Sequence, residues 1–290
     1  MRDRSPLSLA AGSLDLPGLG SDPADRLRAA LAWAAGAGLS GVLIDATRPG
    51  LRPRDLDRSG RREIAALLRR HQLAFVGLDL PVPPEHFSSP AHAERALSAA
   101  HAAAALAAEL HALTADIASP ALRAPRAPIA LELPAGAPAA LRAELARAAE
   151  HTGVWFADAG PARTPQPDAS PATPPTPSNG PLRDAIDVGR ALLDRLDPAA
   201  AVARSGPRLA LLRLAEVTNH GPIPIGVPPS RLDVLALRIA LETSGAPAAV
   251  VLDLTGIADP AAACASAHAA WDALPALGQL AGRPFGSPRT

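Results

Sequence analysis

The sequence predicts an α/β protein that forms a single (β/α)8 TIM barrel over residues 1–290, and three observations support this fold class. Short apolar runs, several of them ending in a carboxylate, alternate with longer segments of helical periodicity along most of the chain. Short parallel strands joined by helices build a parallel sheet, and about eight such units favour a closed barrel over an open sheet. The length of 290 residues suits one barrel, because barrels of ~250 residues are common single domains.

The first half of the chain supplies four of the expected strands and three of the expected helices. Asp22 can cap a helix that has Pro23 at its first position and that ends near Gly36. Ser59 and Ser89 can cap the next two helices, of which the second is long and rich in alanine. The expected strands are the short apolar runs at residues 7–10, 41–46, 74–80 and 113–118.

The second half repeats this alternation. The expected strands lie at residues 129–134, 153–159, 208–214 and 248–254. The expected helices run from about 138 to 151, from 182 to 196, from 231 to 244, and from Asp259 onward. The unit between residues 118 and 129 is the weakest, because its three prolines leave little room for a helix.

Residues 160–181 interrupt the alternation with a segment rich in Pro, Ala, Thr and Ser. It contains almost nothing to bury, so we expect it to be disordered or extended. Because it follows the sixth expected strand, it would emerge at the C-terminal face of the barrel, where active sites of such barrels lie. A lid is one interpretation, and an insertion without function is the other.

The composition argues against several classes of function. The 28 basic and 28 acidic residues balance, so the chain has no overall field to attract nucleic acid or an anionic membrane. Every basic residue other than histidine is arginine, which excludes Schiff-base chemistry and a P-loop lysine. The single cysteine, Cys264, cannot form a disulfide within the chain. No secretory segment or membrane span is evident, so we expect a cytoplasmic protein, with a homo-oligomer left open.

Carboxylates recur at the ends of the expected strands. They are Asp45, Asp79, Asp116, Glu132, Asp158 and Asp253, with Glu216 just past another strand. A closed barrel would bring several of them onto one rim, where they would repel one another unless a cation or a polyol satisfied them. The alternative is that individual carboxylates cap the following helix or accept hydrogen bonds from loop amides.

Several stretches resemble the sugar phosphate isomerase/epimerase family of xylose isomerase-like TIM barrels. They are residues 24–46, residues 50–73, the strands that hold Glu132 and Asp158, and residues 222–241. The resemblance implies a divalent ion such as Mn, Mg, Zn or Co, bound by carboxylates after strands five, six and eight and by a histidine from strand seven. By position, Glu132 and Asp158 match the first two ligands and Asp253 stands where the last is expected, so these three are the candidate metal ligands.

The same resemblance implies that Glu132 and Asp253 form a catalytic acid/base pair that moves a proton on a ketose. Arg213 departs from the pattern, because it stands at the position of the family's histidine and cannot ligate a metal. Strand alternation puts Arg213 on the same face as Leu211 and opposite Leu212 and Leu214, which leaves both directions open. We expect Arg213 to point into the barrel, because the resemblance implies an inward side chain at this position and because a charge is hard to bury under the helices. There it could bind a substrate phosphate or carboxylate. His220 in the next loop and His86 before the third helix are further candidates for substrate binding.

Two functions follow from these candidates. The first is a metal-assisted isomerase or epimerase that acts on a sugar or sugar phosphate. The alternative is a non-catalytic barrel that binds a sugar or an anionic ligand without metal, because an inward Arg213 would take the place of the cation. A related class, the metal-dependent nucleases that act at damaged DNA, is disfavoured because a histidine-rich site and a basic face are not evident.

Overall fold

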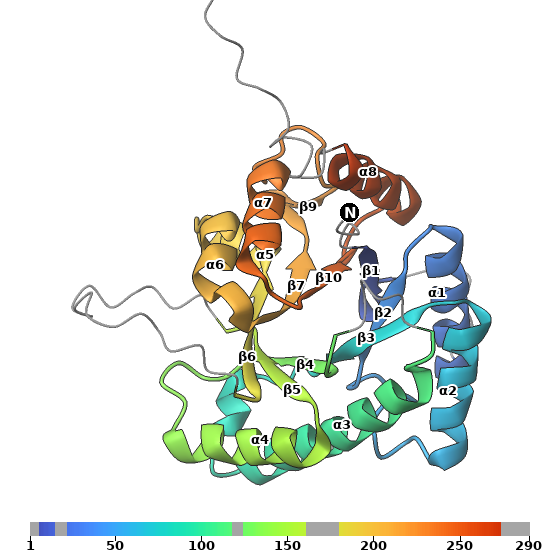
Figure 1. Cartoon of the computed structure of the whole chain (residues 1–290), viewed down its shortest axis with the longest axis vertical. Coiled ribbons are helices and arrows are strands. Elements are labelled where there is room, and N and C mark those ends of the chain that lie inside the picture. Colours follow the sequence, from blue (N-terminus) through green and yellow to red (C-terminus); the bar gives the residue numbers. More distant parts are fainter. Residues whose placement is uncertain (1–5, 15–21, 118–123, 161–179, 274–290) are drawn as a thin grey trace, which may run out of the picture.

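The computed structural model of the chain describes residues 6–14, 22–117, 124–160 and 180–273. Its centre is a closed barrel of eight parallel strands surrounded by helices (Figure 1). The order around the barrel is β1-β10-β7-β6-β5-β4-β3-β2. The expected fold class is therefore confirmed.

The barrel strands are short. They are β1 (Leu7–Ala10), β2 (Gly41–Asp45), β3 (Ala74–Asp79), β4 (Pro128–Leu131), β5 (Trp155–Asp158), β6 (Leu182–Asp187), β7 (Leu209–Leu214) and β10 (Ala249–Leu252). After β7 the chain forms a small antiparallel hairpin of β8 (Glu216–Thr218) and β9 (Gly221–Ile223), which stands apart from the barrel sheet.

The helices connect the strands on the outside of the barrel. They are α1 (Pro23–Gly36), α2 (Arg58–Arg70), α3 (Ala93–Thr114), α4 (Ala139–Thr152), α5 (Val188–Leu193), α6 (Pro198–Ser205), α7 (Val234–Ser244) and α8 (Pro260–Asp272), with a 3-10 turn at Pro84–Phe87. An aspartate N-cap begins most of them, as Asp22 does for α1. The N-cap of α2 is Asp57, two residues before the expected Ser59, and its side chain accepts a hydrogen bond from the amide of Gly60.

Two expected elements differ from the structure. Of the strand expected at residues 113–118, the described part, residues 113–117, is not a strand, because α3 continues to Thr114, whose Oγ1 donates to the Leu110 carbonyl at 2.7 Å. Residues 182–196 do not form one helix, because their first part is strand β6 and α5 begins only at Val188. The expected number of eight barrel strands is thus correct, but β6 is one of them in place of the segment expected at residues 113–118.

This difference in strands changes the place of the Pro-rich insertion in the barrel. The insertion follows β5, the fifth barrel strand, and not the sixth as expected. Most of it, residues 161–179, lies outside the described residues, so its expected disorder stays a prediction. Asp116, expected at the end of a strand, instead lies exposed after α3 and pairs with Arg69 at 3.4 Å.

The barrel interior is filled mostly by small and branched apolar side chains. The buried cluster there contains Ala10, Leu43, Ala74, Val76, Ala130, Trp155, Ala157, Ala185, Ala210, Leu211, Ala249 and Val251. A larger buried cluster fills the layer between the strands and the helices. Gly77 (φ +146°) lets β3 approach β4, because a Cβ there would overlap the Pro128 carbonyl oxygen.

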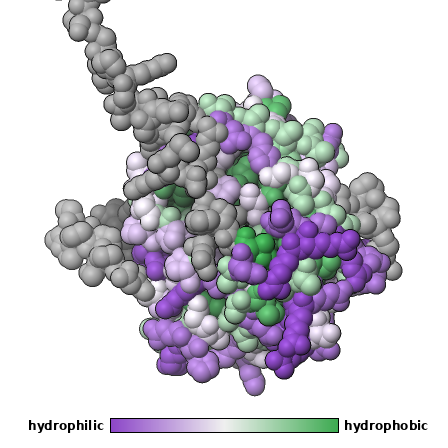
Figure 2. Space-filling view, turned by 45° about the vertical axis from the view of Figure 1, so that its right-hand side comes forward, coloured by the Kyte–Doolittle hydropathy of each residue, from purple (hydrophilic) through white to green (hydrophobic). Residues whose placement is uncertain are grey.

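The surface and the longest helix fit this layered arrangement. The face in Figure 2 mixes hydrophilic and hydrophobic residues, and no single kind covers it. By length and hydropathy, Ala93–Thr114 is the one helix among the described residues that could cross a membrane. However, one face of this helix, which includes Ala100, Ala103, Ala104, Leu106 and Leu110, is buried in the layer between helices and barrel, which is typical of a helix packed on the core of a globular protein.

Candidate functional site at the mouth of the barrel

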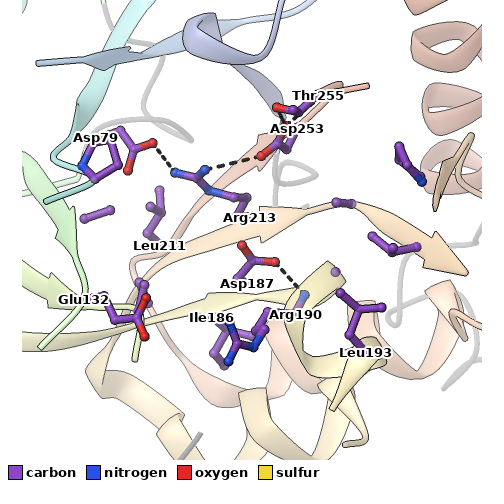
Figure 3. Close-up of a pocket in the computed structure, with 18 of the residues that line it drawn as sticks. Asp79, Glu132, Ile186, Asp187, Arg190, Leu193, Leu211, Arg213, Asp253 and Thr255 are labelled. Atoms are coloured by element: carbon purple, nitrogen blue, oxygen red, sulfur yellow. Dashed lines mark hydrogen bonds and ion pairs between the residues drawn. The ribbon is translucent and has the colours of Figure 1, made fainter. Parts of the chain in front are cut away.

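A pocket of about 380 Å³ opens at the C-terminal end of the barrel strands. The ends of β3, β4, β6, β7 and β10 form its walls, together with the β8–β9 hairpin and the start of α5 (Figure 3). Its charged lining residues are Asp79, Glu132, Asp187, Arg190, Arg213, Glu216 and Asp253. Aliphatic side chains line the rest, among them Leu193, Val217, Pro222, Ile223 and Ile257. The pocket thus combines several convergent charges with apolar walls, which is typical of a small-molecule site.

Arg213 lies in the middle of this pocket. It leaves β7 on the same side as Leu211 and reaches Asp79 on β3, four strands away around the barrel. One terminal nitrogen, Nη2, lies 2.6 Å from Asp79 Oδ2, and the other, Nη1, lies 3.3 Å from Asp253 Oδ2. Figure 3 shows the guanidinium between the two carboxylates. The expected inward orientation of Arg213 is therefore confirmed.

Burial strengthens this ion-paired triad of Asp79, Arg213 and Asp253. The three side chains are 20%, 20% and 14% exposed. Burial raises the pKa of Asp79, although the guanidinium of Arg213 partly opposes this shift. Burial alone would lower the pKa of Arg213, but attraction to Asp79, its hydrogen bond and the charge of Asp253 raise it overall. Arg213 is consequently a fixed cation at any ordinary pH.

Asp253 is held at both oxygens. Its Oδ1 accepts hydrogen bonds from the amide and the hydroxyl of Thr255, at 2.9 and 2.7 Å, while Oδ2 faces Arg213. Asp45 at the end of β2 repeats the arrangement, with Oδ1 bound to the amide and hydroxyl of Thr47. Both carboxylates therefore act as loop anchors as well as charges, which leaves Asp253 poorly placed as a free base.

Glu132, just past β4, also lines the pocket, but its surroundings differ from those of the ion-paired triad. It accepts no hydrogen bond from another described residue, and its carboxylate faces the cavity (Figure 3). It attracts Arg190, whose pKa is raised mainly by its hydrogen bond to Asp194 and in smaller part by the charge of Glu132. Among the pocket carboxylates, Glu132 is thus the one that has no hydrogen-bond partner at either oxygen among the described residues.

The other predicted site residues lie outside the pocket. Asp158 turns away from the interior, because Trp155 and Ala157 occupy the inward positions of β5. Its Oδ1 accepts from the amides of Leu133 and Gly160, at 3.1 and 3.0 Å, and its Oδ2 lies 3.7 Å from Arg142 on α4. The expected pairing of Glu132 and Asp158 around one ion therefore does not form.

The two candidate histidines also point elsewhere. His220 is exposed in the turn of the β8–β9 hairpin and is not a lining residue. His86 lies in the 3-10 turn after β3 with its ring centroid 4.6 Å from that of His92, also outside the pocket. Neither histidine supplies the ligand that the resemblance places on strand seven.

Asp187 and Arg190 are pocket residues that the sequence analysis did not single out. Asp187 ends β6 and caps α5, with its Oδ1 accepting from the Arg190 amide at 2.9 Å. The sequence analysis missed both as site residues, because residues 182–196 were expected to form one helix. A signal was present, since Asp187 follows Ala185 and Ile186 as a carboxylate at the end of a short apolar run.

Glu216 lines the pocket, but both of its carboxylate oxygens already accept hydrogen bonds from backbone amides. It is 1% exposed, and its two oxygens accept hydrogen bonds from the amides of Gly226, Arg231 and Leu232. This carboxylate ties β8 to the loop before α7, so the hairpin wall of the pocket is fixed to the body of the protein.

These residues do not fit a divalent ion. Such an ion needs several oxygen or nitrogen ligands that converge on one point. Within the described ranges, no group of three or more His, Cys, Asp or Glu side chains gathers in this way. Asp79 and Asp253 instead converge on the guanidinium of Arg213, whose fixed charge repels a cation. Glu132 and Asp158 also follow the fourth and fifth barrel strands, one strand earlier than the resemblance implies.

Comparison with known proteins gives matches to solved structures only. No protein-family model matches the chain, and no curated protein does. An L-ribulose 3-epimerase is similar with a TM-score of 0.68 and 14% identity, over 98% of this chain and 100% of the epimerase. The chain has the fold of the xylose isomerase-like sugar epimerases. At this level of identity, the likeness shows the fold alone.

Two further structures extend the comparison. A D-psicose 3-epimerase from Clostridium cellulolyticum H10, solved with D-tagatose, has a TM-score of 0.61 and 15% identity, over 92% of this chain and 97% of its own. A xylose isomerase-like TIM barrel protein from Mycobacterium smegmatis, in complex with magnesium, has a TM-score of 0.58 and 15% identity, over 93% and 95%. The neighbours thus include proteins solved with a sugar and with a metal.

Proposed function

We propose that the pocket binds a neutral sugar or related polyol without a divalent ion, with Arg213 as the cation of the site. The ion-paired triad of Asp79, Arg213 and Asp253 carries this proposal, because it fills the place where carboxylates would otherwise need a metal. A guanidinium has five N–H donors, and its bonds to Asp79 and Asp253 leave others for the hydroxyls of a ligand. Glu132 adds acceptor oxygens on the other side of the cavity.

The charge balance of the pocket favours a neutral ligand over a sugar phosphate. The carboxylates of Asp79, Glu132, Asp187 and Asp253 face two arginines. Arg213 is already paired with two of these carboxylates, and Arg190 pairs with Asp194 at 2.9 Å. A phosphate would add negative charge to a site that already has an excess of it, whereas hydroxyls can donate to the carboxylates. The sugar epimerases among the structural neighbours, one solved with D-tagatose, support the sugar class.

Proton transfer on a ketose is a second candidate function, and the available carboxylate of Glu132 favours it. Glu132 would remove a proton from the carbon next to the carbonyl, and the electron pair of that C–H bond would move through the new C=C bond onto the carbonyl oxygen. Arg213 would stabilise the resulting enediolate by hydrogen bonds. Return of the proton by Glu132 to the neighbouring carbon gives the isomer, whereas the epimer requires that a proton from solvent reaches the opposite face of the same carbon while Glu132 keeps the proton that it removed.

Titration calorimetry of the full chain in the presence of EDTA tests the binding proposal. With D-tagatose and D-allulose as probes, we expect saturable binding that EDTA does not change and that Arg213→Gln weakens at least about tenfold, or ~1.4 kcal/mol. Arg69→Gln, which removes an exposed arginine far from the pocket, is the matched control and should bind normally. Binding that requires an added divalent ion would overturn the proposal.

Proton transfer has a separate readout. NMR of the same ketoses in D2O, with EDTA present, follows loss of the proton next to the carbonyl. The catalytic candidate predicts exchange by the unmodified chain and loss of exchange in Glu132→Gln, while sugar binding persists. Binding without exchange would leave the protein a sugar-binding barrel.

A further inference from the structure

A second cluster of charged side chains lies at the opposite end of the barrel, where strands β4 to β7 begin. Arg126 stands two residues before β4, Arg183 is the second residue of β6, and Arg208 directly precedes β7. We call these three the basal arginines. The carboxylate beside them is Asp184, whose Oδ1 lies 2.9 Å from Nη2 of Arg208.

Arg183 is the centre of this cluster. Its guanidinium carbon lies 4.6 Å from the ring centroid of Trp155, so the arginine stacks on the indole at the floor of the barrel. Its Nη1 donates to the Pro207 carbonyl at 3.1 Å, which fixes the side chain next to β7. Its Nε is buried and has no hydrogen-bond acceptor among the described residues. Burial of a donor without an acceptor is unfavourable, so the site is incomplete as it stands.

The charges around Arg183 are also unbalanced. Burial lowers its pKa first, repulsion from Arg208 and Arg126 lowers it further, and among the described residues Asp184 is the one that opposes the shift. Arg126 reaches this point because the Ala127 carbonyl next to it accepts from the Trp155 amide at 3.0 Å, which joins the start of β4 to β5. Arg208 is 40% exposed, so an ion from solvent can reach the cluster.

We propose that the basal arginines bind a tetrahedral oxyanion, either inorganic phosphate or the phosphate group of a small metabolite. Guanidinium groups bind phosphate through paired N–H donors, and one dianion would offset the excess of positive charge. The site is independent of the sugar pocket, because it stands at the other end of the barrel strands.

Calorimetry and phosphorus NMR with inorganic phosphate, at constant ionic strength, test this site in the full chain. We expect saturable binding, and at least about tenfold weaker binding in Arg126→Gln. Arg126 suits the test because it makes no hydrogen bond to another described residue, so its replacement should not disturb folding. Arg69→Gln, an exposed arginine elsewhere, should leave phosphate affinity unchanged.

Two outcomes would overturn the proposal. One is the absence of saturable phosphate binding at millimolar concentrations. The other is binding that Arg213→Gln abolishes and Arg126→Gln spares, because this would place the anion in the mouth of the barrel. If basal binding is found, comparison of inorganic phosphate with a sugar phosphate and a nucleoside monophosphate shows whether a free ion or a phosphate group is the preferred form.

Discussion

At the mouth of the barrel one arginine lies between two aspartates, whereas at the base three arginines gather around one aspartate. At the mouth, the guanidinium of Arg213 uses both ends of its fork and joins β7 to β3 and β10. At the base, Arg183 lies on an indole ring and keeps a buried donor without a described acceptor. The mouth is thus cross-linked by ion pairs and has an excess of negative charge, whereas the described residues at the base have an excess of positive charge.

The difference shows why residue type alone does not define a site. Both ends of the barrel contain arginine and aspartate, but the number and direction of the carboxylates decide whether the guanidinium is satisfied within the chain. A satisfied arginine organises a pocket for neutral groups. An unbalanced cluster of arginines selects for an anion.

The largest expected effect is the loss of stability on replacement of Arg213. In Arg213→Leu, Asp79 and Asp253 lose their shared cation and remain close together in a mostly buried site. Removal of one partner of a buried pair costs 3–5 kcal/mol, and discounting for the 20% exposure of this pair gives roughly 2–3 kcal/mol. Urea unfolding measures the change in the free energy of unfolding.

The matched replacement at the base sharpens the comparison. Arg183→Leu removes one stacking contact and one hydrogen bond, but it also relieves repulsion with Arg126 and Arg208. We expect a loss of only about 1 kcal/mol. An equal loss in the free energy of unfolding for Arg213→Leu and Arg183→Leu would contradict the proposed difference between the mouth and the base.

The next prediction concerns metal affinity. Arg213→His removes the fixed cation and offers an imidazole ligand near Asp79 and Asp253. We expect titration calorimetry to show Mn²⁺ affinity at least about tenfold above that of the unmodified chain, or ~1.4 kcal/mol. Arg213→Leu, which removes the charge without adding a ligand, is the control. Tight Mn²⁺ binding by the unmodified chain would show that Arg213 does not take the place of an ion.

How far the sequence predicts these two sites depends on how local their determinants are. The spacing of Arg213 to Leu211 leaves its direction open, and the correct choice of the inward direction comes from the resemblance and from the cost of burying a charge under the helices. Strand β6 escapes prediction because Arg183, Asp184 and Asp187 interrupt its apolar pattern. Two of their partners, Trp155 and Arg208, lie more than 20 residues away along the chain.

Asp158 illustrates a different limit. In a strand buried on both faces, alternation places Asp158 opposite to Trp155 and Ala157, but it does not say which face is the interior. Trp155 and Phe156 are both buried, so apolar character cannot decide. Only the closure of the barrel fixes the choice, and it turns Asp158 toward Arg142.

The smallest expected effect is a change in how stability depends on pH. The pKa of Asp79 is raised by burial above its ordinary value of 3.8, so the unfolded chain releases this proton first as pH rises. Between the two pKa values the unfolded state binds fewer protons, and the free energy of unfolding falls as pH increases. The stabilisation from Asp79 is therefore full at pH values below its ordinary pKa, and it is lost as pH rises through the pKa of the folded state.

The variant Asp79→Asn cannot titrate at this position. The free energy of unfolding of the unmodified chain minus that of the variant should therefore fall as pH rises between these two pKa values. Asp116→Asn is the matched control, because Arg69 lowers the pKa of Asp116 and gives a dependence of opposite sign. Urea unfolding from pH 3.5 to 6 measures both differences, and equal slopes for the two variants would refute the buried state of Asp79.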